Sequence, residues 1–147
     1  MNTVKIIPQS HTDHGISPEQ LQWLLDQCED RTSFFIQTFT LPAHLGTVEC
    51  GLVGPALGLP AVPEEDVKYI IRGNRKCASR VLRDPVEKPR TRMVTVIAGP
   101  TKGHDGLVLY TAYGGPSAPR EPGDTTIPNW EGVVESRAFW AEHALIG

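Results

Sequence analysis

Near its N-terminal end the chain has an apolar pattern that is typical of an amphipathic helix. Apolar residues recur every three or four positions: Leu21, Leu24, Leu25 and Cys28. Just before them, Ser17 can act as an N-cap, Pro18 suits the first helical position, and Gln20 completes a capping box. The sequence therefore predicts a helix over residues 18–30.

The middle of the chain has stretches that are rich in aromatic and β-branched residues or that alternate between apolar and polar residues, and both patterns predict strands. The expected strands are 33–41, 47–53, 67–72, 91–98 and 107–113. Segments rich in proline and glycine interrupt them at 54–63, 84–90 and 114–124. Residues 75–82 fit either a short strand or a helical turn. The runs 91–98 and 107–113 are joined by the glycine-containing segment 99–106, so we predict that they form a hairpin.

A second helical pattern closes the chain, with apolar residues at Trp130, Val134, Ala138, Ala141 and Leu145. It predicts a C-terminal helix of roughly four turns. Because the strands do not alternate with helices, we predict an α+β fold, in which one antiparallel sheet of four to six strands carries the N-terminal and C-terminal helices on one face. The length of 147 residues favours a single domain, 1–147.

Composition excludes several classes of protein and leaves function open. The apolar content is near the average of globular proteins, which excludes a wholly disordered or fibrous chain. No apolar run is long enough to span a bilayer, and the first 15 residues lack the pattern of a signal peptide. Three cysteines without a C-x-x-C pair suit a reducing compartment. We therefore expect a cytoplasmic protein that does not bind membranes.

The charge is distributed unevenly, although the net charge is only −3. Residues 1–66 carry 2 basic and 9 acidic side chains, residues 67–104 carry 10 and 2, and residues 105–147 carry 2 and 6. A basic middle between acidic ends fits an anion-binding face, which attracts phosphorylated ligands whatever the net charge. It also fits weak pairing of the basic segment with acidic groups of the same chain, without any function.

The basic segment supplies candidates for phosphate binding, because the planar fork of arginine bonds two phosphate oxygens at once. We expect Arg72, Arg75 and Arg92 to hold a phosphate, and Arg80 to stabilise developing charge in a reaction. Gly73 and Asn74 favour a tight turn beside Arg75. The alternative is a solvated charged face.

Hydroxyl groups at the end of the last predicted strand supply a second set of candidates. Thr111 and Tyr113 share one face of a strand and are followed by Gly114-Gly115, which can let a ligand approach backbone N–H groups. We expect Thr111 and Tyr113 to orient the scissile group and Arg120 of the following loop to bind phosphate. The alternative is that Tyr113 packs in the core and the loop is a rigid connector.

Among the histidines, His44 lies in a predicted loop and is the candidate for a general base, although such a residue is often an ordinary loop histidine. His11, Asp13 and His14 have the chemistry of metal ligands, but no second cluster completes a site. We therefore expect neither a metal nor another cofactor. Gly99–Gly103 is not a P-loop, because it joins two strands and does not open a helix.

Residues 92–98 and 106–113, RMVTVIA and GLVLYTAY, resemble the terminal hairpin of barnase/colicin/RelE-like toxin ribonucleases. The resemblance implies a metal-independent enzyme that cleaves RNA with histidine, arginine or lysine, and hydroxyl side chains on an antiparallel sheet. This chain departs from those enzymes by its extra C-terminal helix, its negative net charge and the absence of a clearly placed histidine in the matching segment.

Residues 50–55 and 114–124 also resemble uncharacterised bacterial proteins labelled "formylmethionine deformylase-like". Deformylases need an H-E-x-x-H motif to bind their metal, and this chain has none.

Together these features favour a small protein that binds RNA or a phosphorylated small molecule. If it is an enzyme, we expect a metal-independent ribonuclease or phosphodiesterase that uses His44, Arg80, Thr111 and Tyr113. The alternative is a module that binds a nucleotide, an anion or a protein partner without chemistry.

Overall fold

The computed structural model describes residues 4–6, 15–28, 33–72, 77–100, 103 and 106–147. For residues 4–6, 72, 77 and 78 the description covers the backbone alone. Contacts within the chain form two compact units. Unit 1 comprises Met1–Cys50 and Arg90–Ser117, and unit 2 comprises Gly51–Pro89 and Ala118–Gly147.

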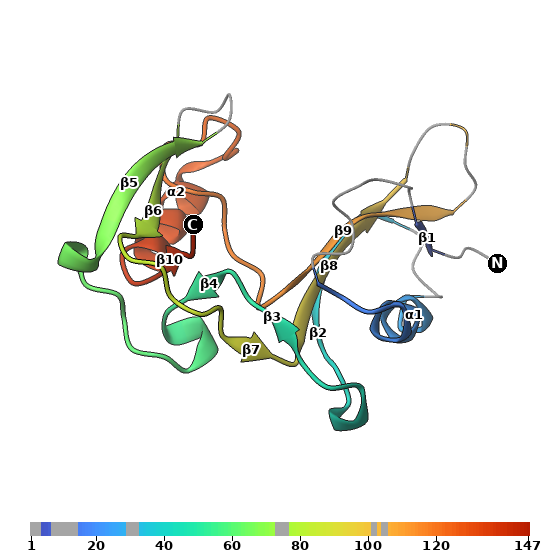
Figure 1. Ribbon diagram of the computed structural model, residues 1–147. Coiled ribbons are helices and arrows are strands. Elements are labelled where there is room, and N and C mark those ends of the chain that lie inside the picture. The colour runs from blue at the N-terminus through green and yellow to red at the C-terminus, as the bar shows by residue number, and fades with distance from the viewer. Residues whose placement is uncertain (1–3, 7–14, 29–32, 73–76, 101–102, 104–105) are drawn as a thin grey trace. The chain divides into compact units, whose positions relative to one another are not determined.

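Unit 1 is built on a four-stranded sheet in the order β1-β9-β8-β2 (Figure 1). The strands are β1 (Val4–Ile6), β9 (Leu107–Gly114), β8 (Met93–Gly99) and β2 (Phe35–Thr40). β8 pairs antiparallel with β2 and β9, as expected for the predicted hairpin, whereas β1 runs parallel to β9. The register of β8 and β9 shifts between Ile97 and Ala98.

Helix α1 (Pro18–Asp26) packs its apolar side against this sheet. The predicted capping box is confirmed, because Ser17 and Gln20 exchange both of its hydrogen bonds. The helix ends at Asp26, earlier than its apolar pattern predicted, and Gln27 caps it by donating its N–H to carbonyls of the last turn. The core of unit 1 is formed by buried residues of helix, loops and strands: Ile16, Leu24, Cys28, Leu41, Val48, Val94, Val96, Ala98, Leu107, Leu109 and Ala112.

A short two-stranded ribbon completes unit 1. It pairs β3 (Val48–Glu49) with β7 (Arg90–Thr91), with Glu49 opposite Arg90. The 3-10 turn η1 (Ala43–Leu45) lies between β2 and β3.

Unit 2 contains a second four-stranded sheet in the order β4-β10-β6-β5. The strands are β4 (Leu52–Val53), β10 (Ala144–Leu145), β6 (Cys77–Leu82) and β5 (Val67–Arg72). β5 and β6 form an antiparallel pair, and β10 runs parallel to β6. The remaining elements are η2 (Pro55–Leu57), η3 (Glu64–Asp66) and α2 (Trp130–Trp140).

The mixture of helices and strands agrees with an α+β fold, but the arrangement of strands differs from the single antiparallel sheet that we expected. The predicted strand 47–53 is divided at Cys50 and Gly51 into β3 and β4, which belong to different units. The predicted C-terminal helix ends at Trp140, because the segment Ala144–Leu145 pairs with β4 and β6 as β10. Among the described residues, no helix combines the length and apolarity needed to cross a membrane.

Candidate functional site

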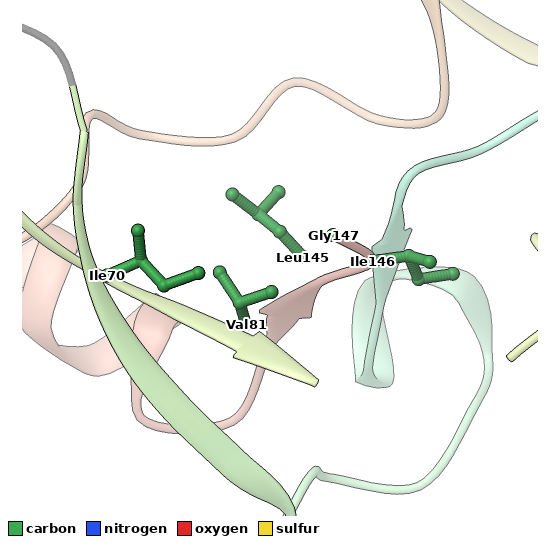
Figure 2. Close-up of a pocket in the computed structure, with 5 residues that line it drawn as sticks. All are labelled: Ile70, Val81, Leu145, Ile146 and Gly147. Atoms are coloured by element: carbon green, nitrogen blue, oxygen red, sulfur yellow. The ribbon is translucent and has the colours of Figure 1, made fainter. Parts of the chain in front are cut away.

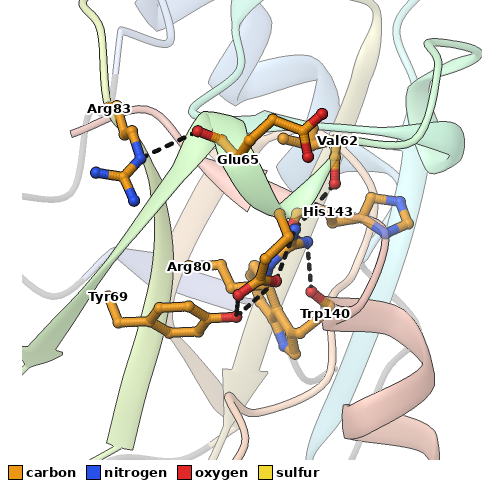
Figure 3. A network of polar contacts seen from close by, with 8 residues as sticks. Val62, Glu65, Tyr69, Arg80, Arg83, Trp140 and His143 are labelled. Carbon is orange, nitrogen blue, oxygen red and sulfur yellow. Dashed lines mark hydrogen bonds and ion pairs between the residues drawn. The ribbon is translucent and has the colours of Figure 1, made fainter.

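Arg80 lies in the interior of unit 2, where the backbone binds its side chain (Figure 3). Nη1 donates to the carbonyls of Trp140 and His143 at 2.7 and 2.9 Å. Nη2 donates to the carbonyl of Val62 at 2.9 Å. The guanidinium thus supplies hydrogen-bond donors to carbonyls at the C-terminal end of α2, where helix carbonyls lack partners in a following turn. Its catalytic role stays a prediction, and both terminal nitrogens already have partners.

His143 is a second buried polar residue of unit 2, and both of its ring nitrogens are used. Nε2 accepts from the N–H of Ala56 at 2.9 Å, and Nδ1 lies 2.8 Å from the carbonyl of Phe139. The Nδ1 atom therefore carries the proton, because a carbonyl can only accept. The ring also stacks on Phe139, with the centroids 3.8 Å apart. These contacts make His143 part of the scaffold.

In unit 1, two arginines hold the ends of residues 41–47, the loop that connects β2 to β3. Arg92 Nε donates to the carbonyl of Leu41, and the N–H of Leu41 donates to the carbonyl of Arg92, both at 2.7 Å. Arg90 donates from Nε to Thr47 Oγ1 at 3.0 Å and from Nη2 to the carbonyl of Thr47 at 2.8 Å. Both arginines are exposed, and no hydrogen bond with another described residue uses Nη1 of Arg90 or either terminal nitrogen of Arg92.

Helix α1 supports the same loop through Gln20, which is buried. Its Oε1 accepts from the N–H of Ser17 at 2.9 Å as part of the capping box. Its Nε2 donates to the carbonyls of Leu45 and Thr47 at 2.9 and 3.3 Å. One side chain therefore couples the start of α1 to the conformation of loop 41–47.

His44 stands in the middle of this loop, within η1, and is exposed. It is three residues from Leu41 and three from Thr47, a length of chain that spans at most about 11 Å. The imidazole of His44 thus lies in the same short loop that the guanidinium groups of Arg90 and Arg92 bind. Glu49 faces Arg90 across the β3–β7 ribbon, so an acidic side chain shares this surface.

Thr111 and Tyr113 lie on the sheet face opposite to the buried Ala112, as the alternation predicted. Tyr113 pairs with Thr95 of β8, which in turn pairs with Thr38 of β2. The hydroxyl groups of Thr38 and Thr95 are 2.8 Å apart, and Thr95 is fully buried. A row of hydroxyl-bearing residues therefore crosses three strands of unit 1.

Gly114 and Gly115 allow the chain to pack closely where β9 ends. A Cβ atom at Gly114 would lie 2.2 Å from the carbonyl oxygen of Glu49, and one at Gly115 would lie 2.5 Å from Cys50 Sγ. The N–H of Gly115 donates to the carbonyl of Met93 at 2.8 Å. That N–H is therefore not open to the ligand that the sequence suggested, because the fold already uses it.

The remaining predicted phosphate-binding residues fall elsewhere. Arg120 is exposed in unit 2 and donates from Nη1 to the carbonyl of Thr126 at 2.8 Å and to the hydroxyl of that residue. Arg72 ends β5 in unit 2, and only its backbone is described. Arg75 lies outside the described residues, as do the possible metal ligands His11, Asp13 and His14.

The predicted site residues therefore divide between the two units. His44, Arg92, Thr111 and Tyr113 belong to unit 1, and Arg72, Arg80 and Arg120 belong to unit 2. Within unit 1 the structure links His44 to Arg92 through loop 41–47, while Tyr113 pairs with Thr95, three positions along the chain from Arg92. Sequence reasoning did not select Arg90 as a site residue or foresee that Gln20 supports the loop; the capping box was the one available signal for Gln20.

Unit 2 also contains an apolar hollow of about 310 Å³ (Figure 2). It is lined by Ile70, Val81, Leu145, Ile146 and Gly147. Because none of these side chains titrates or attacks as a nucleophile, the hollow offers packing surface without reactive groups.

No group of three or more histidine, cysteine, aspartate or glutamate residues suited to a metal ion occurs in the part of the chain that the structure describes. Comparisons with protein-family models, curated proteins and solved structures found no match for this chain.

Proposed function

We propose that unit 1 binds a phosphodiester or nucleotide at loop 41–47, with Arg90 and Arg92 holding the phosphate beside His44. The observation that supports this proposal is that both arginines are bound through Nε to the backbone or hydroxyl of the loop that carries His44. A guanidinium held through Nε loses little freedom when its other N–H groups bind a second partner.

In the catalytic form of this proposal, the protein cleaves RNA or a related phosphodiester without a metal ion. The 2′-oxygen bonds to the phosphorus while the P–O5′ bond breaks, which gives a 2′,3′-cyclic phosphate and a 5′-hydroxyl. His44 accepts the proton of the 2′-hydroxyl, the 5′-oxygen takes a proton from water, and the resulting hydroxide takes the proton back from His44. The two guanidinium groups offset the charge that develops on the phosphate oxygens. Thr111 and Tyr113 are the candidates for orienting the scissile group. In the alternative form, the same loop binds its ligand without turnover.

Binding of a short fluorescent single-stranded RNA and of a nucleoside triphosphate tests the site. The double variant Arg90→Gln/Arg92→Gln should raise Kd at least tenfold, and it should reduce the dependence of log K on log salt by about 0.7 per lost phosphate contact on the RNA. The matched control is Arg83→Gln/Arg137→Gln, which removes the same charge from exposed arginines of unit 2. Equal losses in both double variants would show that binding follows net charge and would reject the site.

The catalytic form requires a separate measurement. With the same RNA and a chelator present, His44→Ala should abolish cleavage and leave Kd within about twofold, because His44 is exposed and supports no described contact of the fold. Cleavage that survives in His44→Ala would remove the histidine from the mechanism. Binding without any cleavage by the parent chain would establish the non-catalytic alternative.

A further inference from the structure

Strand β5 presents apolar side chains at an open sheet edge in unit 2. It is the last strand in the order β4-β10-β6-β5, so no strand of the described chain pairs with its outer edge. Tyr69 is 54% exposed and Ile71 is 64% exposed. Long strand edges that combine free backbone groups with apolar side chains are templates for pairing with another strand.

The register of β5 shows which backbone groups face this edge. The N–H of Arg83 donates to the carbonyl of Asp66 at 3.0 Å, one position beyond the Val67–Leu82 pair that ends the β5–β6 register. Hydrogen-bonded and non-hydrogen-bonded pairs alternate along an antiparallel ladder. Residues at even positions of β5 therefore bond to β6, and Tyr69 and Ile71 direct their N–H and C=O groups outward, whereas the N–H of Val67 already donates to the carbonyl of Glu64.

We propose that β5 pairs antiparallel with β5 of a second copy of this chain, across a two-fold axis at Tyr69. In this register Tyr69 hydrogen-bonds to Tyr69 of the other copy, and the carbonyl of Val67 accepts from the N–H of Ile71. The pairing satisfies outward backbone groups on both strands and covers the exposed side chain of Ile71. It joins the two sheets edge to edge through a self-complementary contact, which is the usual form of a symmetric dimer.

The charges at the ends of β5 favour a second copy over an unrelated strand. Asp66 precedes the strand and Arg72 is its last residue. The two-fold axis at Tyr69 places Asp66 of each copy opposite Arg72 of the other, and such opposite-charge pairs stabilise antiparallel strands. A partner strand with charges of one sign would face a like charge at one of these ends.

A register-specific cross-link tests the pairing. Tyr69→Cys should form an intermolecular disulfide under mild oxidation, because hydrogen-bonded residues in facing strands have Cα atoms about 5.5 Å apart. The matched control is Ile70→Cys. In this register position 70 lies diagonally from position 70 of the other copy, beyond the reach of a disulfide. The parent chain measures cross-linking by the native cysteines. Equal cross-linking of both variants, or none by Tyr69→Cys, would overturn the proposed register.

The oligomeric state provides the second test. The parent chain should form dimers at micromolar concentration in sedimentation or light-scattering measurements. Ile71→Lys should weaken association at least tenfold, while Val134→Lys on α2, another exposed apolar position, should leave it unchanged. Exchange of the two end charges tests their pairing. Asp66→Arg and Arg72→Asp should each weaken the dimer, and the double variant should restore it. A monomeric parent chain, or an Ile71→Lys dimer of unchanged strength, would reject the proposal.

Discussion

Arg80 Nη1 donates a 2.9 Å hydrogen bond to the backbone carbonyl of His143, while the ring of His143 accepts a hydrogen bond from the backbone of Ala56. Three segments of unit 2 that are distant in sequence therefore meet through two polar side chains: strand β6, the residues after α2, and the turn η2. Because both side chains are buried, the fold depends on these contacts more than it would on exposed ones.

Replacement of Arg80 should lower the free energy of unfolding of unit 2, and this loss should be measurable in the absence of any ligand. Arg80→Ala leaves the carbonyls of Val62, Trp140 and His143 without their donor, and we expect a loss of about 3 kcal/mol or more in the free energy of unfolding. Chemical denaturation followed by tryptophan fluorescence measures it. Arg83→Ala is the control and should cost less than about 0.5 kcal/mol, because Arg83 is exposed. Equal stability of the two variants would contradict the structural role of Arg80.

Gly54 should tolerate no side chain. Its φ is +139°, and a Cβ atom would lie 2.5 Å from the ring of His143, so Gly54→Ala should cost about 2 kcal/mol or more. Gly58→Ala separates strain from clash, because Gly58 has φ +73° but no atom within 4 Å of the added Cβ; we expect about 1 kcal/mol. Thermal unfolding of both variants measures the difference. A Gly58→Ala loss as large as that of Gly54→Ala would show that His143 is not the obstacle.

Replacement of Gln20 should lower both the stability of unit 1 and its affinity for RNA. Gln20→Ala removes half of the capping box and the donor to Leu45 and Thr47, and should cost about 1–3 kcal/mol. It should also raise Kd for RNA, because loop 41–47 loses its support from α1. The control Gln22→Ala removes only an exposed hydrogen bond to Asp26. Unchanged RNA affinity in a folded Gln20→Ala variant would mean that loop order does not affect the site.

Thr38 and Thr95 should show non-additive effects. Thr95 donates to the carbonyl of Gly115 at 2.8 Å, and Thr38 Oγ1 accepts from the N–H of Ser117 at 3.1 Å. Thr95→Val should cost about 1–2 kcal/mol, because it leaves a buried carbonyl without a donor. In a double-mutant cycle with Thr38→Val, the second substitution should cost less than it does alone. Strict additivity would show that the two hydroxyl groups act independently.

Local signals in the sequence predicted the elements whose causes are themselves local. Ser17 and Gln20 identified the start of α1, and the β-branched runs 91–98 and 107–113 identified the β8–β9 hairpin. The division of 47–53 and the end of the C-terminal helix were missed, because both depend on pairing with strands that are distant in sequence. Such pairings leave no mark in a short window of residues.

The candidate site was harder to predict than the fold. The pattern of charges indicated an arginine-rich region, but the sequence does not distinguish a buried arginine of a strand from an exposed one. Arg80 lies in the interior and Arg92 is exposed, and only the course of the backbone around each one decides this. The sequence therefore indicated arginine as the residue type of the candidate site, but it did not show which arginines are exposed.

The chain passes from one unit to the other after Cys50, Pro89 and Ser117. Neither unit is a continuous stretch of the chain. During synthesis, residues 1–50 therefore cannot complete the sheet of unit 1 until the β8–β9 hairpin has been made, and residues 51–89 are made in between. The sheet of unit 2 is completed after that of unit 1, because β10 lies between β4 and β6 and follows the other described strands along the chain. A chain shortened to end before Ala144 would keep every strand of unit 1 but would lack a central strand of unit 2.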